Sequence, residues 1–420
     1  MTITYKVLVA LGLAALCAMG VPALSLADAL AIDAESPGPG TRDIRRYDIY
    51  VADQETYDSN LYRLPTSSIV AANFPNANGG QDHYNSASLG TRGLWTSGLQ
   101  QIIYHARVDE NRFSRNTTLN SSTGLGDLTW NWQFGPHFSG QLGGYYRRAL
   151  ASFAETRFLG HDLLATTAVF GLGRYQVGPR WAVYGGFNNS TNKHSAEAIQ
   201  YDNSHGKTAN AGIEYATDVN NTIGWEYAYA DRRYSNLILF NGAQFDRSFR
   251  ETTNQLVVKY ALSGKTSVEA HAGYLNHYYP SSPVGAFSGN IWRISLHWSA
   301  TEKIQVVADG WRELRATLFA QSDHFLAKGV SFTPVWKPSE KIKISFALAS
   351  DNQNFIGLDS SVLTFAVRSD KVRSQQLSLQ YQATKALVLE VSYRDEQRTS
   401  NQVLFQFDDR LAKAWLTFTF

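Results

Sequence analysis

The chain ends in the stretch Ala412-Lys413-Ala414-Trp415-Leu416-Thr417-Phe418-Thr419-Phe420. Every second residue from Ala412 to Phe420 is apolar, and the positions between them hold Lys413, two threonines and a tryptophan. Successive side chains of a β-strand point to opposite faces, so this alternation predicts a strand with one apolar and one more polar face. A strand buried on both faces would instead have a continuous apolar sequence.

The same alternation recurs along most of the chain from residue 83 onward. Clear examples lie at 128–134, 268–274, 292–298, 342–348 and 387–393. Short turns such as Ser97-Gly98, Gly178-Pro179-Arg180 and Thr384-Lys385 alternate with longer polar stretches, which include 113–123, 193–204, 234–250, 279–288 and 353–370. Short turns on one side and long loops on the other predict an all-β, transmembrane antiparallel β-barrel with periplasmic turns and extracellular loops.

The spacing of the turns also predicts the number of strands. Eight short turns join sixteen strands between about residues 83 and 399, and the segments 44–63 and 409–420 each add one. We therefore expect about 18 strands, or 16 if the first hairpin is partly periplasmic. An even number of strands places both ends of the barrel on the periplasmic side. A β-propeller also fits a repeat of about 40 residues, but its four short strands per blade and its recurring motifs are not seen.

Composition supports a protein of the cell envelope and excludes other classes. The 420 residues carry 38 Lys+Arg and 36 Asp+Glu, a net charge of +2 that argues against a nucleic-acid partner. Mean hydropathy is −0.27, which excludes a bundle of membrane helices. Residues 1–27 resemble a secretory signal peptide, with Lys6, an apolar run at 7–21 and the cleavage site Ser25-Leu26-Ala27. The single cysteine, Cys17, falls within it, so we expect a cysteine-free mature chain.

The predicted domains follow from these boundaries: a signal peptide at 1–27, a flexible N-terminal segment at 28–43, and the barrel at 44–420. In a barrel surrounded by lipid, the apolar face of each strand points outward and the alternate positions point into the lumen. Charges of both signs fall at these alternate positions, where only a water-filled interior would tolerate them. The predicted pore-lining residues are Arg92, His105, Arg107, Asp109, Arg147, Glu214, Glu226, Lys259, Glu269, His271, Arg293, Lys343, Glu390 and Arg394.

No catalytic, metal-binding or cofactor-binding motif emerges from the sequence, so we predict no enzyme activity, no metal and no cofactor. A nucleophile elbow of the Gly-x-Ser-x-Gly type is missing. His194 and His205 flank a loop, where histidines are usually solvated. Asp58-Ser59-Asn60 fits a turn in which the aspartate side chain accepts a backbone N–H. The segment 244–251 carries four charges and is our candidate for a loop folded into the barrel.

The terminal strand carries a further signal. A last strand with alternating apolar residues and a final phenylalanine resembles the recognition signal of the outer-membrane barrel assembly machinery. Phe418 and Phe420 are therefore the expected assembly signal. This resemblance implies the barrel assembly machinery and outer-membrane lipid as partners.

The first strand carries a family resemblance. Tyr57-Asp58-Ser59-Asn60-Leu61-Tyr62-Arg63-Leu64-Pro65 resembles a stretch of EpsL-type proteins, outer-membrane barrels encoded with exopolysaccharide and exosortase genes. A broader group of β-barrel porins has similar openings. The resemblance implies export of a secreted polysaccharide through the outer membrane, together with periplasmic export components.

Three functions remain open at this point. The first hypothesis is a passive, water-filled exit pore for an extracellular polysaccharide in the bacterial outer membrane. The second is a general diffusion porin for small polar solutes. The third is a surface binding or structural barrel whose long loops hold a partner.

Overall fold

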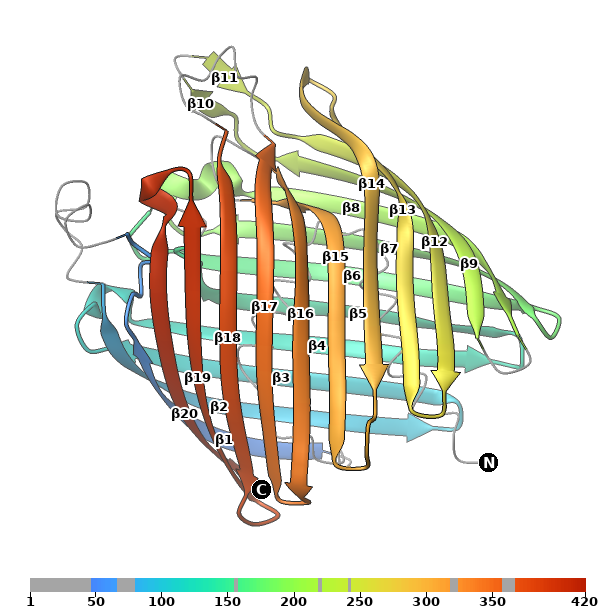
Figure 1. Cartoon of the computed structure of the whole chain (residues 1–420), viewed down its shortest axis with the longest axis horizontal. Helices are drawn as coiled ribbons and strands as arrows, with labels where there is room; N and C mark the ends of the chain where they lie inside the picture. Colours follow the sequence, from blue (N-terminus) through green and yellow to red (C-terminus); the bar gives the residue numbers. More distant parts are fainter. Residues whose placement is uncertain are drawn as a thin grey trace.

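The strands form one closed antiparallel barrel (Figure 1). The computed structural model describes residues 47–65, 80–154, 158–217, 221–240, 243–317, 324–356 and 367–420. Within these residues 18 strands form the barrel, and β10 and β11 form a separate hairpin. The strands are β1 (Tyr47–Asp58), β2 (Asp82–Ser97), β3 (Gln100–Phe113), β4 (Ser121–Phe134), β5 (Phe138–Leu150), β6 (Leu163–Val177), β7 (Trp181–His194), β8 (Ser204–Ala216), β9 (Thr222–Tyr234), β10 (Ile238–Phe240), β11 (Ala243–Phe245), β12 (Phe249–Ser263), β13 (Thr266–Tyr279), β14 (Ser282–Trp298), β15 (Ile304–Ala316), β16 (His324–Ser339), β17 (Ile342–Ile356), β18 (Ser369–Gln382), β19 (Leu387–Ser400) and β20 (Phe407–Thr419).

Each barrel strand pairs with its neighbour in sequence, and two pairings complete the circle. Strand β9 pairs with β12 across the β10–β11 hairpin, and β1 pairs with β20. Closure leaves no free sheet edge, which is the condition for a sheet to cross a bilayer. The predicted 18-strand antiparallel barrel is therefore confirmed.

Helical structure in the described residues is limited to three short 3₁₀ segments. They are η1 (Thr117–Leu119), η2 (Glu197–Asp202) and η3 (Val403–Phe405). None of the helices in these parts of the chain is long and apolar enough to cross a membrane.

The two ends of the barrel differ as the sequence predicted. At the short-turn end, strands are joined by tight connections such as the one between β2 and β3, where Gly98 has a φ of 57°. Gly178, between β6 and β7, has a φ of 70°. This backbone conformation strains residues that carry a Cβ atom, which explains glycine at these turns. Strand β1 begins and β20 ends at the short-turn end, and the other end is the long-loop end.

Two segments differ from the sequence prediction. The first strand, expected over 44–63, ends at Asp58 because the backbone turns there. The expected loop 279–288 is largely strand: β13 continues to Tyr279 and β14 begins at Ser282. This ribbon extends beyond the body of the barrel (Figure 1). The predicted signal peptide at 1–27 and the N-terminal segment at 28–43 lie outside the described residues.

The outward face of the barrel is apolar and exposed. In β3, for example, Val108 is 62% exposed, and its neighbours Arg107 and Asp109 are half-buried. Leu89, Leu128 and Val330 are likewise exposed on their strands. So much apolar surface is typical of a protein surrounded by lipid and not of a barrel in water.

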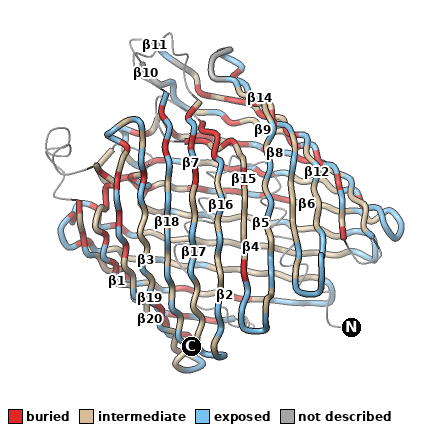
Figure 2. Tube along the Cα trace, in the orientation of Figure 1, coloured by how far each residue is buried: buried red, intermediate tan, exposed pale blue. Residues whose placement is uncertain are grey.

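The burial of residues changes along the length of the barrel (Figure 2). Many of the buried residues gather toward the long-loop ends of the strands, whereas fewer residues near the short turns, such as Tyr50 and Ala182, are buried. In β12, for instance, Phe249, Glu251 and Thr253 are buried, and the inward residues that follow are half-buried. The interior is therefore more tightly filled near the long-loop end.

Candidate functional site: the inward face of the barrel

All fourteen predicted pore-lining residues lie on the strand face opposite to the exposed apolar side chains, which we call the inward face. Glu226 and Glu390 are buried there, and the other twelve are half-buried. They come from ten strands, so the charges are spread around the circumference. The set is Arg92, His105, Arg107, Asp109, Arg147, Glu214, Glu226, Lys259, Glu269, His271, Arg293, Lys343, Glu390 and Arg394.

Many of these charges are paired with one another or with a neighbour. Arg107 Nε lies 2.9 Å from Asp109 Oδ1, and His271 Nε2 lies 3.1 Å from Glu269 Oε1. Arg174, which the sequence analysis did not select, pairs with Glu214. The predicted wall of mixed charge is therefore also a wall of ion pairs, in which each sign is largely neutralised locally.

A second network on the inward face was missed by the sequence analysis. Glu313 accepts hydrogen bonds from Arg293 at 3.1 Å and from Arg315 at 3.1 Å. Arg315 also lies 3.7 Å from Asp351, whose Oδ1 accepts the indole N–H of Trp311 at 2.9 Å. The alternation of side chains along β15 would by itself have placed Glu313 and Arg315 on this face, because both residues lie between outward-facing residues of the strand.

The long-loop end holds buried ion pairs. Arg368 donates to Asp370 at 2.9 Å, and Arg398 Nε lies 3.8 Å from the same carboxylate, with all three side chains at most 4% exposed. Arg247 pairs with Asp202 of η2. Burial raises the pKa of Asp202, and the Arg247 guanidinium opposes that rise. These paired charges fill space on the inner side of the barrel end.

The stretch Tyr57–Pro65 forms a turn that fastens strand ends together. Asp58 Oδ1 accepts the backbone N–H of Asn60 at 2.9 Å, which matches the predicted turn. The Asn60 side chain accepts the Leu64 N–H at 2.9 Å and donates to the Leu64 carbonyl at 2.7 Å. Arg63, at a φ of 53°, reaches both Asp58 of β1 and Asp409 of β20 at 3.0 Å.

Apolar residues of the same stretch pack beneath the turn. Leu61, Tyr62 and Leu64 are buried in a cluster with Phe113 and Phe153. The Tyr62 ring packs edge-on against Phe153, with 4.9 Å between ring centroids. The motif that carries the EpsL-type resemblance thus has a local structural role: it holds the barrel closure between β1 and β20 and covers it with apolar side chains.

The long-loop ends of β15 and β16 bend into the barrel. We call residues 314–316 and 324–326 the inward strand ends. By register Leu314, Leu326 and His324 should face outward, yet they are 8%, 8% and 1% exposed. Strand β14 pairs with β15 only as far as Trp292 and Arg312, and beyond that pair the two strands diverge (Figure 1). The inward face of β12 and β13 covers the inward strand ends, because His324 contacts Phe249 and His277.

Three smaller sequence predictions have structural outcomes. His194, expected to be solvated, is buried: its Nδ1 lies 2.6 Å from Asp162 Oδ2. His205 is half-buried on β8, 3.2 Å from the Thr191 hydroxyl. The segment 244–251 begins in the β10–β11 hairpin, which projects beyond the barrel (Figure 1), and ends in β12; between them Arg247 pairs with Asp202 of η2. The described part of this segment therefore does not cross the lumen.

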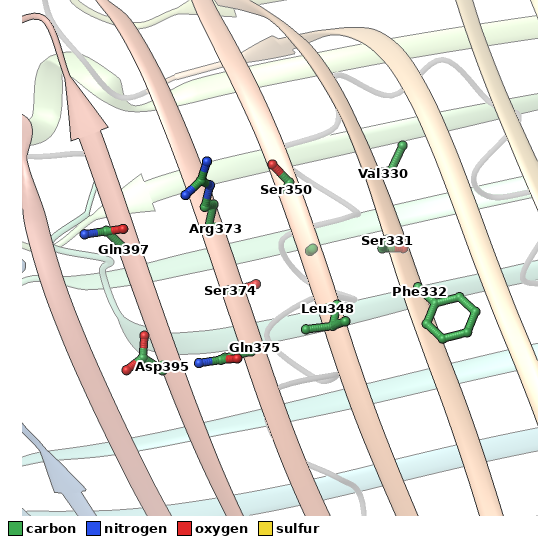
Figure 3. Close-up of a pocket in the computed structure, with 11 residues that line it drawn as sticks. Val330, Ser331, Phe332, Leu348, Ser350, Arg373, Ser374, Gln375, Asp395 and Gln397 are labelled. Carbon is green, nitrogen blue, oxygen red and sulfur yellow. The ribbon is translucent and has the colours of Figure 1, made fainter.

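A hollow of about 560 Å³ lies on the outer wall of β16 to β19 (Figure 3). Val330, Phe332 and Leu348, three of the residues that line it, belong to the exposed apolar face. Arg373 and Asp395 line its polar side. This hollow therefore faces the surroundings of the barrel and is separate from the inward face.

Comparisons with known proteins agree with this architecture. Residues 213–420 match the family model described as "Putative beta-barrel porin 2". No curated protein matches the chain.

Solved porin structures are similar in shape. A BenF-like porin from Pseudomonas fluorescens Pf-5 is 11% identical, with 90% of this chain and 100% of that chain covered and a TM-score of 0.49. OccK2 (OpdF) of Pseudomonas aeruginosa is 10% identical, with 89% and 98% covered and a TM-score of 0.46. OccAB3 of Acinetobacter baumannii is 9% identical, with 89% and 99% covered and a TM-score of 0.46. Similarities at this low sequence identity give no information about which solutes this protein passes. The closed barrel with its two unlike faces agrees with the similarity of residues 213–420 to this family of β-barrel porins.

Proposed function

We propose that this protein is an outer-membrane diffusion pore for small polar solutes. The observation that supports it best is the contrast between the two faces of a closed 18-strand barrel, apolar outside and charged inside. Barrels of about 16–18 strands are wide enough for an aqueous channel. A passive pore needs neither a cofactor nor a covalent step.

The pairing of charges on the inward face supports passage of neutral or weakly charged solutes. Arg107 with Asp109, Arg293 with Glu313 and Lys259 with Glu269 each place opposite charges next to each other. Such a wall offers many hydrogen-bonding groups but little net field at a distance. It suits neutral or weakly charged polar molecules, which exchange hydrogen bonds with the wall as they move.

The filled long-loop end favours small solutes over a thick polymer. Buried ion pairs and the inward strand ends occupy the inner side of this end. We therefore expect a size limit set near the long-loop end, with a wider space toward the short turns.

Liposome swelling with sugars of increasing size tests the proposal. Liposomes that contain the purified barrel should swell rapidly in a monosaccharide and progressively more slowly in di-, tri- and tetrasaccharides. Empty liposomes serve as the control. A folded barrel that gives no swelling with any sugar and no conductance in planar bilayers would contradict the proposed function.

A charge reversal on the inward face provides a sharper test. In the variant Arg107→Glu/Arg147→Glu/Arg293→Glu, three inward cations become anions, so the pore should shift toward cation selectivity. The matched control reverses the exposed outward residues Arg112, Arg148 and Arg233, with the same change in net charge. Reversal potentials across a salt gradient measure the shift. Equal shifts in both variants would mean that the inward residues do not line the conduction path.

Export of an exopolysaccharide is the second candidate, and the Tyr57–Pro65 resemblance favours it. That stretch is occupied in fastening strand ends, so its residues do not distinguish one cargo from another. This candidate adds periplasmic export components as partners. It requires that deletion of the gene abolish extracellular polysaccharide while growth on small carbon sources stays normal. Slower growth on a small solute with unchanged polysaccharide would favour the diffusion pore.

A further inference from the structure

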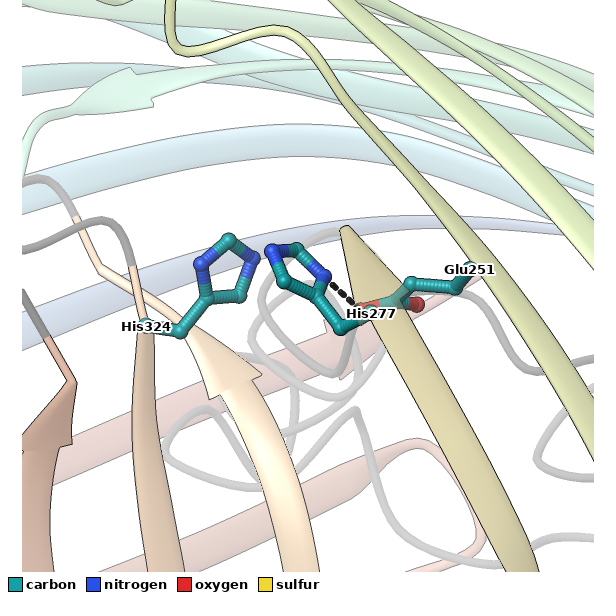
Figure 4. A group of neighbouring side chains, drawn as sticks. All are labelled: Glu251, His277 and His324. Carbon is teal, nitrogen blue, oxygen red and sulfur yellow. Dashed lines mark hydrogen bonds and ion pairs between the residues drawn. The ribbon is translucent and has the colours of Figure 1, made fainter. Parts of the chain in front are cut away.

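A buried carboxylate and two imidazoles meet at the contact between β12–β13 and the inward strand ends (Figure 4). Glu251 comes from β12, His277 from β13 and His324 from the first position of β16. These three residues are 6%, 1% and 1% exposed. One ligand atom from each residue lies within 4.8 Å of the others. We propose that these three residues bind a divalent transition-metal ion, with Zn²⁺ as the best-suited ion, and that the ion fastens the inward strand ends to the barrel wall.

The donor set is typical of zinc. Neutral imidazole nitrogen and carboxylate oxygen are ordinary zinc ligands, at about 2.0–2.2 Å from the ion. Donors on a tetrahedral ion are then roughly 3.3 Å apart. The ligand atoms here lie within 4.8 Å of one another, so ion binding would have to draw them closer together. Three protein ligands leave one position for water or for a further side chain.

Hydrogen bonds already orient both imidazoles. His277 Nδ1 lies 2.9 Å from Glu251 Oε1, and His324 Nδ1 lies 3.0 Å from the Tyr279 hydroxyl. Metal-binding histidines usually hold their second ring nitrogen in this way, which fixes the ring and its tautomer. Because Oε1 of Glu251 is the partner of His277 Nδ1, the ion would take the other carboxylate oxygen, Oε2. The rings of His277 and His324 lie next to each other, tilted by 59°, with 3.9 Å between their centroids (Figure 4).

One ring nitrogen lacks a protein partner in the described residues. His277 Nε2 is fully buried and has no hydrogen-bond partner there. Leaving a buried polar atom unsatisfied is unfavourable, and a bound ion would remove that penalty. Phe249 packs against both rings, at 4.6 Å between centroids, and keeps them in place.

The site also offers a negative charge that can balance a bound cation. Among the described residues, Glu251 forms its one ion pair with His277. The neighbouring Arg247 is paired with Asp202 instead. The Glu251 carboxylate is therefore left to balance part of the charge of a cation.

An ion at this position would also link strands that the backbone leaves apart. Strands β14 and β15 diverge at this level, so no backbone hydrogen bonds hold β15 to β14 here. A ligand from β16 joined to ligands from β12 and β13 would bridge the separation. The inference does not depend on which solute passes through the pore.

The test uses the purified full barrel in detergent, without a histidine tag and stripped with EDTA. The probe is Co²⁺, whose visible d–d absorption reports its ligand geometry, followed by Zn²⁺ competition and elemental analysis. Wild type should bind one equivalent. His277→Gln and His324→Gln should each weaken binding by at least the roughly 10–100-fold that loss of an outer-shell partner of a metal ligand causes. Zn²⁺ should also raise the temperature at which wild type loses its heat-modifiable form.

His194→Gln is the matched control. It too removes a buried histidine that pairs with a carboxylate, but it has no second histidine in its pair. It should bind Co²⁺ as wild type does. Wild-type protein without stoichiometric binding, or a His277→Gln/His324→Gln double variant that binds equally well, would overturn the site. Binding with no rise in the unfolding temperature would overturn the fastening role. The wild-type titration is decisive even if a variant fails to fold.

Discussion

At the scale of single residues, the barrel is held together by charged groups that burial forces into pairs. Arg63 is the clearest case, because one guanidinium serves two carboxylates that are 4% and 0% exposed. Removing one partner of a buried ion pair leaves an uncompensated charge, which is far more unfavourable than loss of an exposed pair.

Arg63→Met should therefore destabilise the barrel strongly, because Asp58 and Asp409 would be left without their shared cation. We expect a loss of about 3–5 kcal/mol in the free energy of unfolding. Urea unfolding of the barrel in lipid vesicles measures it. Arg233→Met is the control: that arginine also pairs with an aspartate, Asp231, but is 69% exposed, so its loss should change stability by less than about 1 kcal/mol. Similar losses in the two variants would refute this account of the turn.

Asp162 gives the long-loop end a dependence on pH. Burial alone would raise the pKa of Asp162, but hydrogen bonds from His194, Ser195 and the Ala196 N–H lower it below its ordinary value. A carboxyl with a lowered folded-state pKa stabilises the folded state above its unfolded pKa of about 3.9, and this contribution is lost as pH falls through the folded value. Protection of the Ala196 amide from hydrogen exchange should thus decline below about pH 4. Asp162→Asn should remove that pH dependence, and a wild-type profile in the variant would contradict the assignment.

At the scale of elements, alternation predicted the strands well because lipid and lumen impose opposite demands on the two faces of every strand. The same rule placed residues such as Arg107 and Glu226 on the inward face. It was wrong at 279–288, where β13 continues to Tyr279 and β14 begins at Ser282 although the sequence does not alternate. It also missed His324, which lies on the outward register of β16 and is buried only because β15 and β16 bend inward. Such bending depends on contacts between distant strands, which no local pattern records.

The terminal strand carries a prediction of its own. Phe420 is 73% exposed, its N–H donates to the Ile49 carbonyl at 2.8 Å, and its ring packs on Phe418. We expect Phe420→Asp to lower the amount of heat-modifiable barrel in outer membranes. A charged residue would replace the exposed aromatic side chain that we expect the barrel assembly machinery to recognise. Phe138→Asp, another exposed aromatic near a short turn, is the control and should assemble normally. Equal yields of all three proteins would show that Phe420 is not an assembly signal.

At the scale of the whole molecule, the two ends of the barrel are built differently, and that difference sets the orientation. The short-turn end holds both ends of the barrel chain and tight connections such as that around Glu302. The long-loop end holds the β10–β11 hairpin, the buried ion pairs and the proposed metal site. Outer-membrane barrels keep short turns in the periplasm, so the long-loop end should face the cell exterior. A size limit and a metal site would then both lie where solutes first enter.

Cysteine labelling on intact cells tests this orientation. The exposed residue Gln244 of β11 should react as Gln244→Cys with a membrane-impermeant thiol reagent, whereas Glu302→Cys should react only after the cells are broken. Both changes are made in a Cys17→Ser background, so that no other thiol contributes. Labelling of Glu302→Cys but not Gln244→Cys on intact cells would invert the barrel. The inward strand ends and their ion would then lie at the periplasmic opening of the pore. Solutes would be selected as they leave the pore and not as they enter it.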